Sequence, residues 1–526
     1  MVWHIFKKDL RLLWVFALTV GALQFASAAV RLWLDVAPTP QLGAVAPVLT
    51  VLTFLGMVVL TVAAMHQDAV PGVSQDWLVR PIPRRDLILA RFLFVLLIVQ
   101  GPALVVDLGA NLVHGFGFGV SLQAALARNA ALLCLMTLPA AMLGSVTRSV
   151  TELLVLTLAG LVAYAAIFAI GALMLLRVRT SIGGTGLAWI TLATWYALAI
   201  VGAPVVVATQ YLWRRTTAVR GLVFTGGAAV FLSAFMPWRL AVAIQQRLAP
   251  EPGAANGITV AFDPGLGKFK VASGAPAGPG RVLYLPLRVS GIPSSAAVIL
   301  DRAEVRIRDT GGKLIYEGRT NLSVDGFGSI QDAQVEARQG REGQGAVALY
   351  QRVFLPGAVL TWLARRPVDF DIDYTLTLFR PRGTHSLPAV DGRGALGELG
   401  SCSTRIDSEG DDVQLRCTSI QTAPSCFTAY LENGAAGVRN PEVHVCHPNY
   451  LPFDANFWPD SLTRSSGELP FFDRSGLTRY PIDGPKLADA RFVVQTYAPR
   501  DHFARHIHLP EVRLSDFIGA AGVAAR

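Results

Sequence analysis

The first half of the chain is a succession of long apolar stretches joined by short polar connections, and the second half is not. A bilayer core about 30 Å thick requires about 20 apolar residues in a helix. Seven stretches are long enough, and we expect each of them to cross a membrane. They lie at about 12–32, 43–65, 87–112, 124–146, 151–176, 187–210 and 220–238.

The pattern changes near Pro250. Gly and Pro are dense through 250–280, which is typical of a linker or of irregular packing, and we assign residues 241–280 to a linker. Beyond them, apolar and polar residues alternate in short runs bounded by turn residues, which predicts half-buried strands. We expect strands near 281–290, 304–309, 314–317, 345–355, 369–379, 412–420, 426–431, 442–446, 490–497 and 506–514.

These patterns predict an α-helical polytopic membrane domain over 1–240, then the linker, then a mostly β domain over 281–526. Short strands with frequent turns favour an antiparallel sandwich. Whether the second half is one domain or two small ones is left open.

Basic residues belong mainly to the apolar half. Residues 1–249 hold 17 Lys and Arg against 7 Asp and Glu, whereas residues 250–526 hold 29 against 30. Positive charge in short loops marks the cytoplasmic side of membrane proteins, and a nucleic-acid surface would instead gather on a soluble face. We therefore expect a lipid bilayer as partner and no nucleic acid.

The orientation follows from the same charges. With the N-terminus inside, 11 Lys and Arg fall on the cytoplasmic side and 5 on the other. Seven spans then place the β domain outside the cytoplasm. Because Arg far outnumbers Lys, we expect a bacterial protein, located in the inner membrane.

The N-terminus allows two pairs of interpretations. Lys7, Lys8, the apolar run and Ala26-Ser27-Ala28 are similar to a cleavable signal peptide, but the length of the apolar run and the six spans that follow favour a retained first span. Residues 1–10 are either a short interfacial helix or a frayed tail.

Four of the five cysteines lie in the β half, and an even number suits an oxidising compartment. Cys402 and Cys417 are equidistant from a turn, and Cys426 and Cys446 flank a loop. Each pair is thus placed for a disulfide between neighbouring strands. The alternative is four buried free thiols. Cys134, in the fourth span, is expected to be a packing residue.

Catalytic motifs are not found. The segment Gly265–Lys268 lacks the first Gly and the Ser or Thr of a phosphate loop, and no hydrolase or metalloprotease motif occurs. We expect no enzyme activity and no cofactor in this chain. His506 and His508 share a strand face, and His444, Cys446 and His447 are close in sequence, but a disulfide would use Cys446, so we expect no metal site.

The third span carries a polar stripe. Helical spacing places on one face the residues Gln100, Asp107, Asn111 and His114. Polar groups in hydrocarbon are costly and usually face the bundle interior. We expect Asp107 to pair with Arg128 at the start of the fourth span. The stripe either lines a translocation path or forms a structural pair and a solvated helix end.

The connection between the second and third spans is too polar to enter lipid. Ser74 is a candidate N-cap for one or two helical turns that end before Pro81. Trp77 and Leu78 are apolar, so this loop either docks a cytoplasmic partner or anchors the third span at the interface. The candidate docking residues are Ser74, Asp76, Trp77, Leu78, Arg80, Pro81, Arg84, Arg85 and Asp86.

A basic N-terminal segment, a first span and the loop D-W-L-V-R-P-I-P-R-R-D-L at 76–87 together resemble permeases of the type-2 ABC exporter family. Leu143–Ser149 is similar in style, and the resemblance covers about 1–240. It implies pairing with a second copy or another permease, a separate ATPase, and a coupling helix at about Ser74–Val79. A seventh span and a large outer domain depart from the family's six spans.

The leading hypothesis is therefore a permease-like subunit of a bacterial ABC exporter. The alternative is a non-transporting membrane anchor that displays a β-sandwich binding module. An envelope enzyme would require a convergent polar site in the outer domain, for which the sequence offers no candidate.

Overall fold

The structure is a computed structural model of the whole chain. It describes residues 1–36, 40–67, 83–160, 162, 188–233, 238–266, 270–271, 282–293, 296–320, 347–354, 363, 366–396, 401–406, 412–419, 426–433, 438–439, 443–446, 474–481, 489–517 and 520–521.

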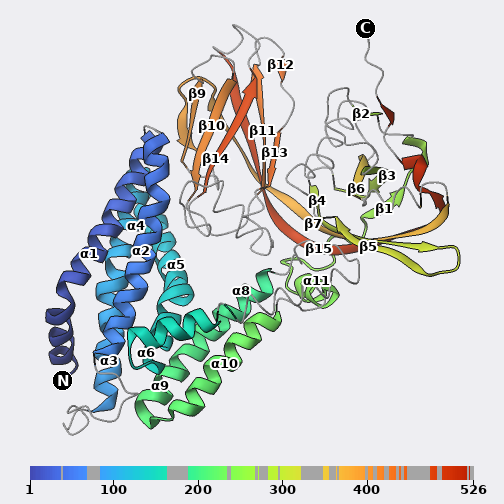
Figure 1. The fold of residues 1–526 in the computed structure, drawn as a ribbon. Coiled ribbons are helices and arrows are strands. Elements are labelled where there is room, and N and C mark those ends of the chain that lie inside the picture. Colours follow the sequence, from blue (N-terminus) through green and yellow to red (C-terminus); the bar gives the residue numbers. More distant parts are fainter. Residues whose placement is uncertain are drawn as a thin grey trace.

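Helices form the N-terminal half, shown in blue to green in Figure 1. The α-helices are α1 (Val2–Val36), α2 (Pro40–His66), α3 (Arg84–Phe94), α4 (Gly101–Val113), α5 (Phe118–Leu132), α6 (Leu138–Val146), α8 (Ala188–Ala197), α9 (Ala203–Trp213), α10 (Thr216–Ser233) and α11 (Trp238–Arg247). Three π-helical segments join some of them end to end: η2 (Val95–Gln100), η3 (Leu133–Thr137) and η4 (Leu198–Gly202).

Six continuous helices of the described chain are long and apolar enough to cross a membrane: Val2–Trp33, Ala44–His66, Arg84–Val113, Phe118–Val146, Ala193–Trp213 and Thr216–Ser233. Each matches one of the expected spans. The expected span at 151–176 begins as the apolar helix Val150–Gly160, and nearly all of its remainder lies outside the described residues. The number of seven thus stays a prediction.

Residues 1–10 are the first turns of α1 and not a separate element, so neither interpretation of this segment was right. Phe6 is 4% exposed and Asp9 is fully buried. Phe6 packs against Phe94 of α3, with ring centroids 6.2 Å apart. This packing explains why the helix continues through Lys7 and Lys8, whose charged side chains lie outside the contact.

Each π-helical segment of the described chain ends two residues before a proline. The prolines are Pro102, Pro139 and Pro204. Proline has no N–H to donate, and its ring clashes with the carbonyl group four residues earlier, which here always falls inside the π segment. Wider turns relieve this clash, and other groups satisfy the backbone freed there. Within η2, Gln24 Nε2 of α1 donates to the Val99 carbonyl at 3.2 Å.

Strands form most of the C-terminal half. They are β1 (Thr259–Phe262), β2 (Lys270–Val271), β3 (Val282–Ser290), β4 (Ala297–Asp309), β5 (Leu314–Thr320), β6 (Val347–Phe354), β7 (Pro367–Pro388), β8 (Arg393–Ala395), β9 (Ser401–Ile406), β10 (Asp412–Ser419), β11 (Cys426–Asn433), β12 (Val438–Arg439), β13 (Val443–Cys446), β14 (Arg474–Pro481), β15 (Arg491–Arg513) and β16 (Ala520–Ala521). The sheets have the orders β1-β3-β6, β14-β10-β9-β8, β12-β11-β15-β7-β4-β5 and β16-β2, with β13 paired to β11.

Two long strands, β7 and β15, connect two separate hydrophobic cores (Figure 1). The first core joins apolar side chains of β3, β4, β7 and β15, among them Leu285 and Phe370. The second joins the other ends of β7 and β15 to β9, β10 and β11, among them Leu415 and Phe492. The β half therefore has two lobes that share a two-stranded ribbon.

The expected strands 490–497 and 506–514 are one strand. β15 pairs with β7 along its length, with register shifts between Thr496 and Tyr497 and between Pro499 and Asp501. Such bulges bend a strand and interrupt its alternation. Because the alternation of apolar and polar residues is interrupted there, the sequence predicted two strands. The expected hairpin at 304–317 is confirmed as β4–β5, with Gly312 at φ 80° in its turn.

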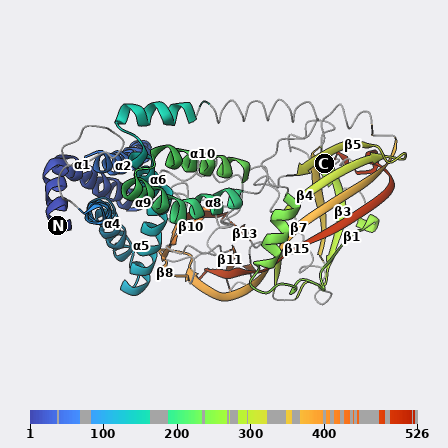
Figure 2. The same ribbon diagram turned by 90° about the horizontal axis from the view of Figure 1, so that it is seen from below.

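The expected linker 241–280 is largely ordered over its described part. It contains most of α11, a turn at 251–257, β1 and a 3-10 turn at Pro264–Leu266. Glycine and proline serve here to form tight turns against β15. Figure 2, seen from below, shows the helices at one end of the molecule and the lobe with β1, β3, β4 and β5 at the other, with β8, β10, β11 and β13 between them.

Candidate functional site

The connection between α2 and α3 was expected to dock a partner. Of its candidate residues, Ser74, Asp76, Trp77, Leu78, Arg80 and Pro81 lie outside the described residues. Arg84, Arg85 and Asp86 form the first turn of α3, so the loop ends earlier than expected. Asp86 is favourably placed there, because a carboxylate near a helix N-terminus interacts with the helix dipole.

The start of α3 is packed between two other helices. Leu87 and Ala90 lie in a cluster with Ile5 of α1 and Tyr211 of α9. Arg84 Nη1 also donates to the carbonyl of Leu212. A displacement of the start of α3 would therefore disturb its contacts with both α1 and α9.

Asp9 and Arg91 form a buried ion pair between α1 and α3. Arg91 Nη1 lies 2.6 Å from Asp9 Oδ2, and the side chains are 1% and 0% exposed. Arg91 faces α1, so its side chain is enclosed between the two helices. The sequence signal was the spacing of Ile5 and Asp9, which puts the carboxylate on the buried face of α1.

The expected pair between Asp107 and Arg128 is confirmed. Arg128 Nε donates to Asp107 Oδ2 at 2.6 Å, and Arg128 Nη2 lies 2.5 Å from Asp107 Oδ1. This two-point geometry is the strong form of an arginine–carboxylate contact. The Arg128 side chain is 6% exposed and the Asp107 side chain 21%.

The rest of the polar stripe extends the same interface. Asn111 Oδ1 accepts from Arg128 Nη2 at 2.7 Å, and Asn111 Nδ2 donates to the Ser121 carbonyl at 3.3 Å. Gln100 Nε2 donates to Thr137 Oγ1 at 2.6 Å, which joins η2 to η3. His114 follows the last turn of α4. The stripe thus binds the third span to the fourth, and this favours a structural role for most of its members.

A second cluster of polar side chains lies between the end of α6 and the start of the helix Val150–Gly160. Glu152 N donates to Ser149 Oγ at 3.2 Å, and Glu152 Oε1 accepts from Arg220 Nη2 of α10 at 2.6 Å. His66 Nε2 lies 2.9 Å from Thr147 Oγ1. These contacts were not predicted, although Ser149 and Glu152 have the spacing of a helix capping box.

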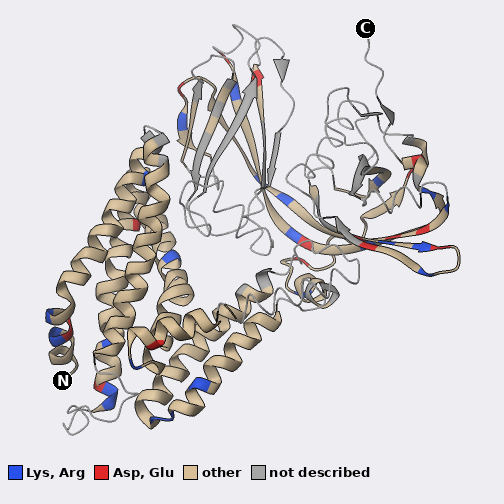
Figure 3. Cartoon of the chain, in the orientation of Figure 1, with Lys and Arg blue, Asp and Glu red and all other residues tan. Residues whose placement is uncertain are grey.

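Charged residues are distributed differently in the two halves of the molecule. Figure 3 shows few of them along the helices, and many of those lie near the end where the N-terminus is drawn. On the β half they lie along the strands. The largest group occupies the solvent face of β4, β7 and β15.

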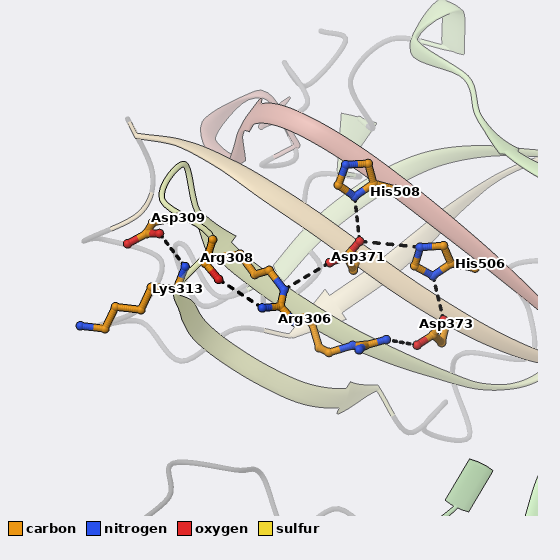
Figure 4. A network of polar contacts seen from close by, with 9 residues as sticks. Arg306, Arg308, Asp309, Lys313, Asp371, Asp373, His506 and His508 are labelled. Carbon is orange, nitrogen blue, oxygen red and sulfur yellow. Dashed lines mark hydrogen bonds and ion pairs between the residues drawn. The ribbon is translucent and has the colours of Figure 1, made fainter. Parts of the chain in front are cut away.

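This group is an ion ladder across three strands (Figure 4). Asp371 and Asp373 of β7 stand between arginines of β4 and histidines of β15. Arg306 Nη2 contacts Asp373 Oδ2, and His506 Nδ1 lies 2.8 Å from Asp373 Oδ1. His508 Nδ1 lies 2.7 Å from Asp371 Oδ1. Both histidine side chains are 52% exposed, whereas the carboxylates are 15% and 19% exposed.

The shared face of His506 and His508 is thereby confirmed. Among the described residues, no three His, Cys, Asp or Glu side chains are grouped so as to hold a metal ion. Part of the other suggested cluster is also described: His444 and Cys446 belong to β13, whereas His447 lies outside the described residues.

The cysteines stand opposite one another as expected. The strand register pairs Cys402 with Cys417 between β9 and β10, and Cys426 with Cys446 between β11 and β13. Directly opposite positions are the geometry from which a cross-strand disulfide forms.

No protein-family model matches this sequence, and no curated protein matches it either.

Proposed function

We propose that this chain is the permease-like transmembrane subunit of a bacterial ABC exporter, coupled to a separate ATPase through the connection between α2 and α3. The observation that carries the proposal is the packing of α3. Its first turns, which directly follow that connection, contact both α1 and α9. A partner that displaced the connection would thus move three helices together.

The coupling would act as a shift between two arrangements of the bundle. ATP hydrolysis in the partner would move the connection, and the difference in partner affinity would favour one arrangement. Arg91 carries this movement to α1, because separating it from Asp9 would break a buried ion pair, which is costly. The π segments next to Pro102, Pro139 and Pro204 are places where the spans can bend.

The remaining features belong to the same proposal. The subunit would sit in the inner membrane with its N-terminus in the cytoplasm and would pair with a second copy or another permease. The two β lobes would be extracytoplasmic sandwiches. There, the opposed cysteines would form the disulfides Cys402–Cys417 and Cys426–Cys446, since that compartment is oxidising.

The test is a mild-detergent pull-down of the tagged chain from its native host. A Trp77→Ala/Arg80→Ala variant should lose an ATPase subunit that the unmodified chain retains. A Trp213→Ala/Arg215→Ala variant is the matched control, because Trp213 is an exposed tryptophan beside another connection of the bundle. Equal recovery of the ATPase with all three chains would contradict the assignment of the coupling site.

A second candidate is a non-transporting anchor that displays the β lobes. It is favoured by the ordered attachment of the lobes to the last helix. It predicts that no ATPase is recovered with any chain and that changes in 66–86 are tolerated.

Thiol labelling of intact cells after mild reduction would separately test the orientation. Labelling of the β-half cysteines only after lysis would place that half in the cytoplasm.

The polar stripe can be tested within the leading proposal. If Asp107 lines the translocation path, Asp107→Asn should lower the transport-coupled ATPase rate of the purified complex while the complex still assembles. If both expression and rate are unchanged, Asp107 has no role in translocation.

A further inference from the structure

Helix α11 begins only a few residues after the last span. Ser233 ends α10 and Trp238 starts α11. Five residues of extended chain reach at most roughly 18 Å, at about 3.6 Å per residue. The start of α11 therefore lies within that distance of the point where α10, a helix long and apolar enough to cross a membrane, ends.

The direction of α11 differs from that of the first spans. In Figure 1, α1 and α2 run up the picture, whereas α11 is viewed down its axis. A helix that crosses the direction of the spans near a bilayer boundary lies along the membrane surface.

The two faces of α11 have different surroundings. Towards the sheet, Gln245 Nε2 lies 3.4 Å from His502 Nδ1 of β15. On the other side Leu240 is 52% exposed, Ala243 and Arg247 are also exposed, and Leu248 just beyond the helix is 73% exposed. Among the described residues beyond 250, by contrast, the exposed large apolar side chains are Leu314 and Val390.

The chain that follows α11 holds it in this orientation. Glu251 accepts from Arg500 Nε at 2.6 Å and from Arg380 Nη1 at 2.9 Å. Asp501 Oδ2 accepts from the backbone N–H groups of Gly253 and Ala255 at 3.1 and 2.9 Å. The exposed face of α11 therefore cannot turn towards the sheet without breaking these contacts.

We propose that α11 is an interfacial helix that binds the bilayer surface through Leu240, Ala243 and Arg247 and supports the β lobes on its other face. The partner is the lipid surface, because only four residues of sequence separate α11 from α10, which is long and apolar enough to cross a bilayer. The segment 238–250 contains Arg239 and Arg247 but no Asp or Glu. Basic amphipathic helices bind at the boundary of headgroups and acyl chains. The proposal does not depend on exporter activity.

The test uses the full chain with Cys134→Ala, reconstituted in vesicles of phosphatidylethanolamine and phosphatidylglycerol. A polarity-sensitive fluorophore is attached at Leu240→Cys, at Gln245→Cys on the face towards β15, or at Leu314→Cys in the β4–β5 hairpin. Nitroxide groups on the lipid acyl chains should quench the label at position 240 several-fold more than at either other position. Iodide in the water should quench the label at position 314 most.

If the label at position 240 is as accessible to iodide as the one at 314 and is not quenched by the lipid nitroxide, the proposal is wrong. Ala243→Cys, on the same exposed face, provides a second probe should the change at Leu240 prevent folding. Equal shielding of positions 240 and 245 from both quenchers would also overturn the proposal, because it would show protein covering both faces.

Discussion

The helical half exposes apolar side chains and buries an ion pair, whereas the β half buries apolar side chains and exposes charged ones. Along the helices, apolar residues such as Phe25, Leu55 and Leu97 face outward, whereas Asp9 and Arg91 are buried. In the β lobes, Leu285 and Phe370 are buried, and the ion ladder of Asp371 and Asp373 lies on the solvent face. The difference shows that each half is arranged for its own solvent, lipid in one case and water in the other.

An ion pair should therefore contribute more to the free energy of unfolding in the helical half than in the β half. A buried pair has lost its water, so removing one partner leaves an uncompensated charge. An exposed pair is screened, and water replaces the lost partner. The predictions below test this difference.

Removal of Arg91 should have the largest effect. Arg91→Met removes the arginine that contacts the buried Asp9 carboxylate, and we expect a loss of about 3–5 kcal/mol in the free energy of unfolding. Thermal unfolding in detergent measures it. Arg85→Met, on the exposed first turn of α3, is the control and should change little. Equal melting temperatures for both variants would show that the pair does not stabilise the bundle.

The Cys402–Cys417 pairing should give the next largest effect. Closing a loop of about 15 residues stabilises a fold by about 3 kcal/mol in the chain-entropy model. We expect Cys402→Ser/Cys417→Ser to lower the stability of the β half by that order, and Cys134→Ser to leave it unchanged. Non-reducing peptide mapping should recover Cys402 joined to Cys417. Recovery of free thiols at both positions would refute the pairing.

Acid should weaken the β half through His502. Burial lowers the pKa of His502, and nearby Asp501 opposes this less strongly. The unfolded chain then binds a proton more readily than the folded one, so stability is retained above about pH 6.5 and falls as the pH drops below it. His502→Asn should flatten urea-unfolding midpoints between about pH 6.5 and 5. An unchanged slope in this variant would mean that other groups cause the pH dependence.

The ion ladder should contribute least. Asp373→Asn removes the contacts with Arg306, which like Asp373 is 19% exposed, and with the 52% exposed His506; exposed pairs are worth about 0.2–1 kcal/mol, and we expect a loss near the upper end of that range. Chemical unfolding should show a loss within that range, and the loss should shrink at high salt. An effect as large as that of Arg91→Met would remove the distinction between the two halves.

Several features were predictable because they are local. The spans follow from the length of apolar runs, and the β4–β5 hairpin follows from its turn residues. Asp107 and Arg128 are 21 residues apart across one helical hairpin, so helical spacing alone brings them together. The cysteine register follows from equal distances to a turn.

Other features were not predictable because they depend on distant parts of the chain. Asp9 and Arg91 are 82 residues apart, and nothing near Asp9 indicates which helix will cover it. The attachment of Glu251 to Arg500 spans 249 residues. β15 was taken as two strands because its bulges break the alternation on which sequence-based prediction depends.

The sequence by itself determined the class of each segment, since apolar length and alternation report which solvent a segment will meet. The tertiary structure alone decided which faces meet, because contact between two surfaces depends on the shapes of both. It placed Arg91 inside the bundle, turned an expected linker into an ordered attachment, and joined two β lobes through one ribbon.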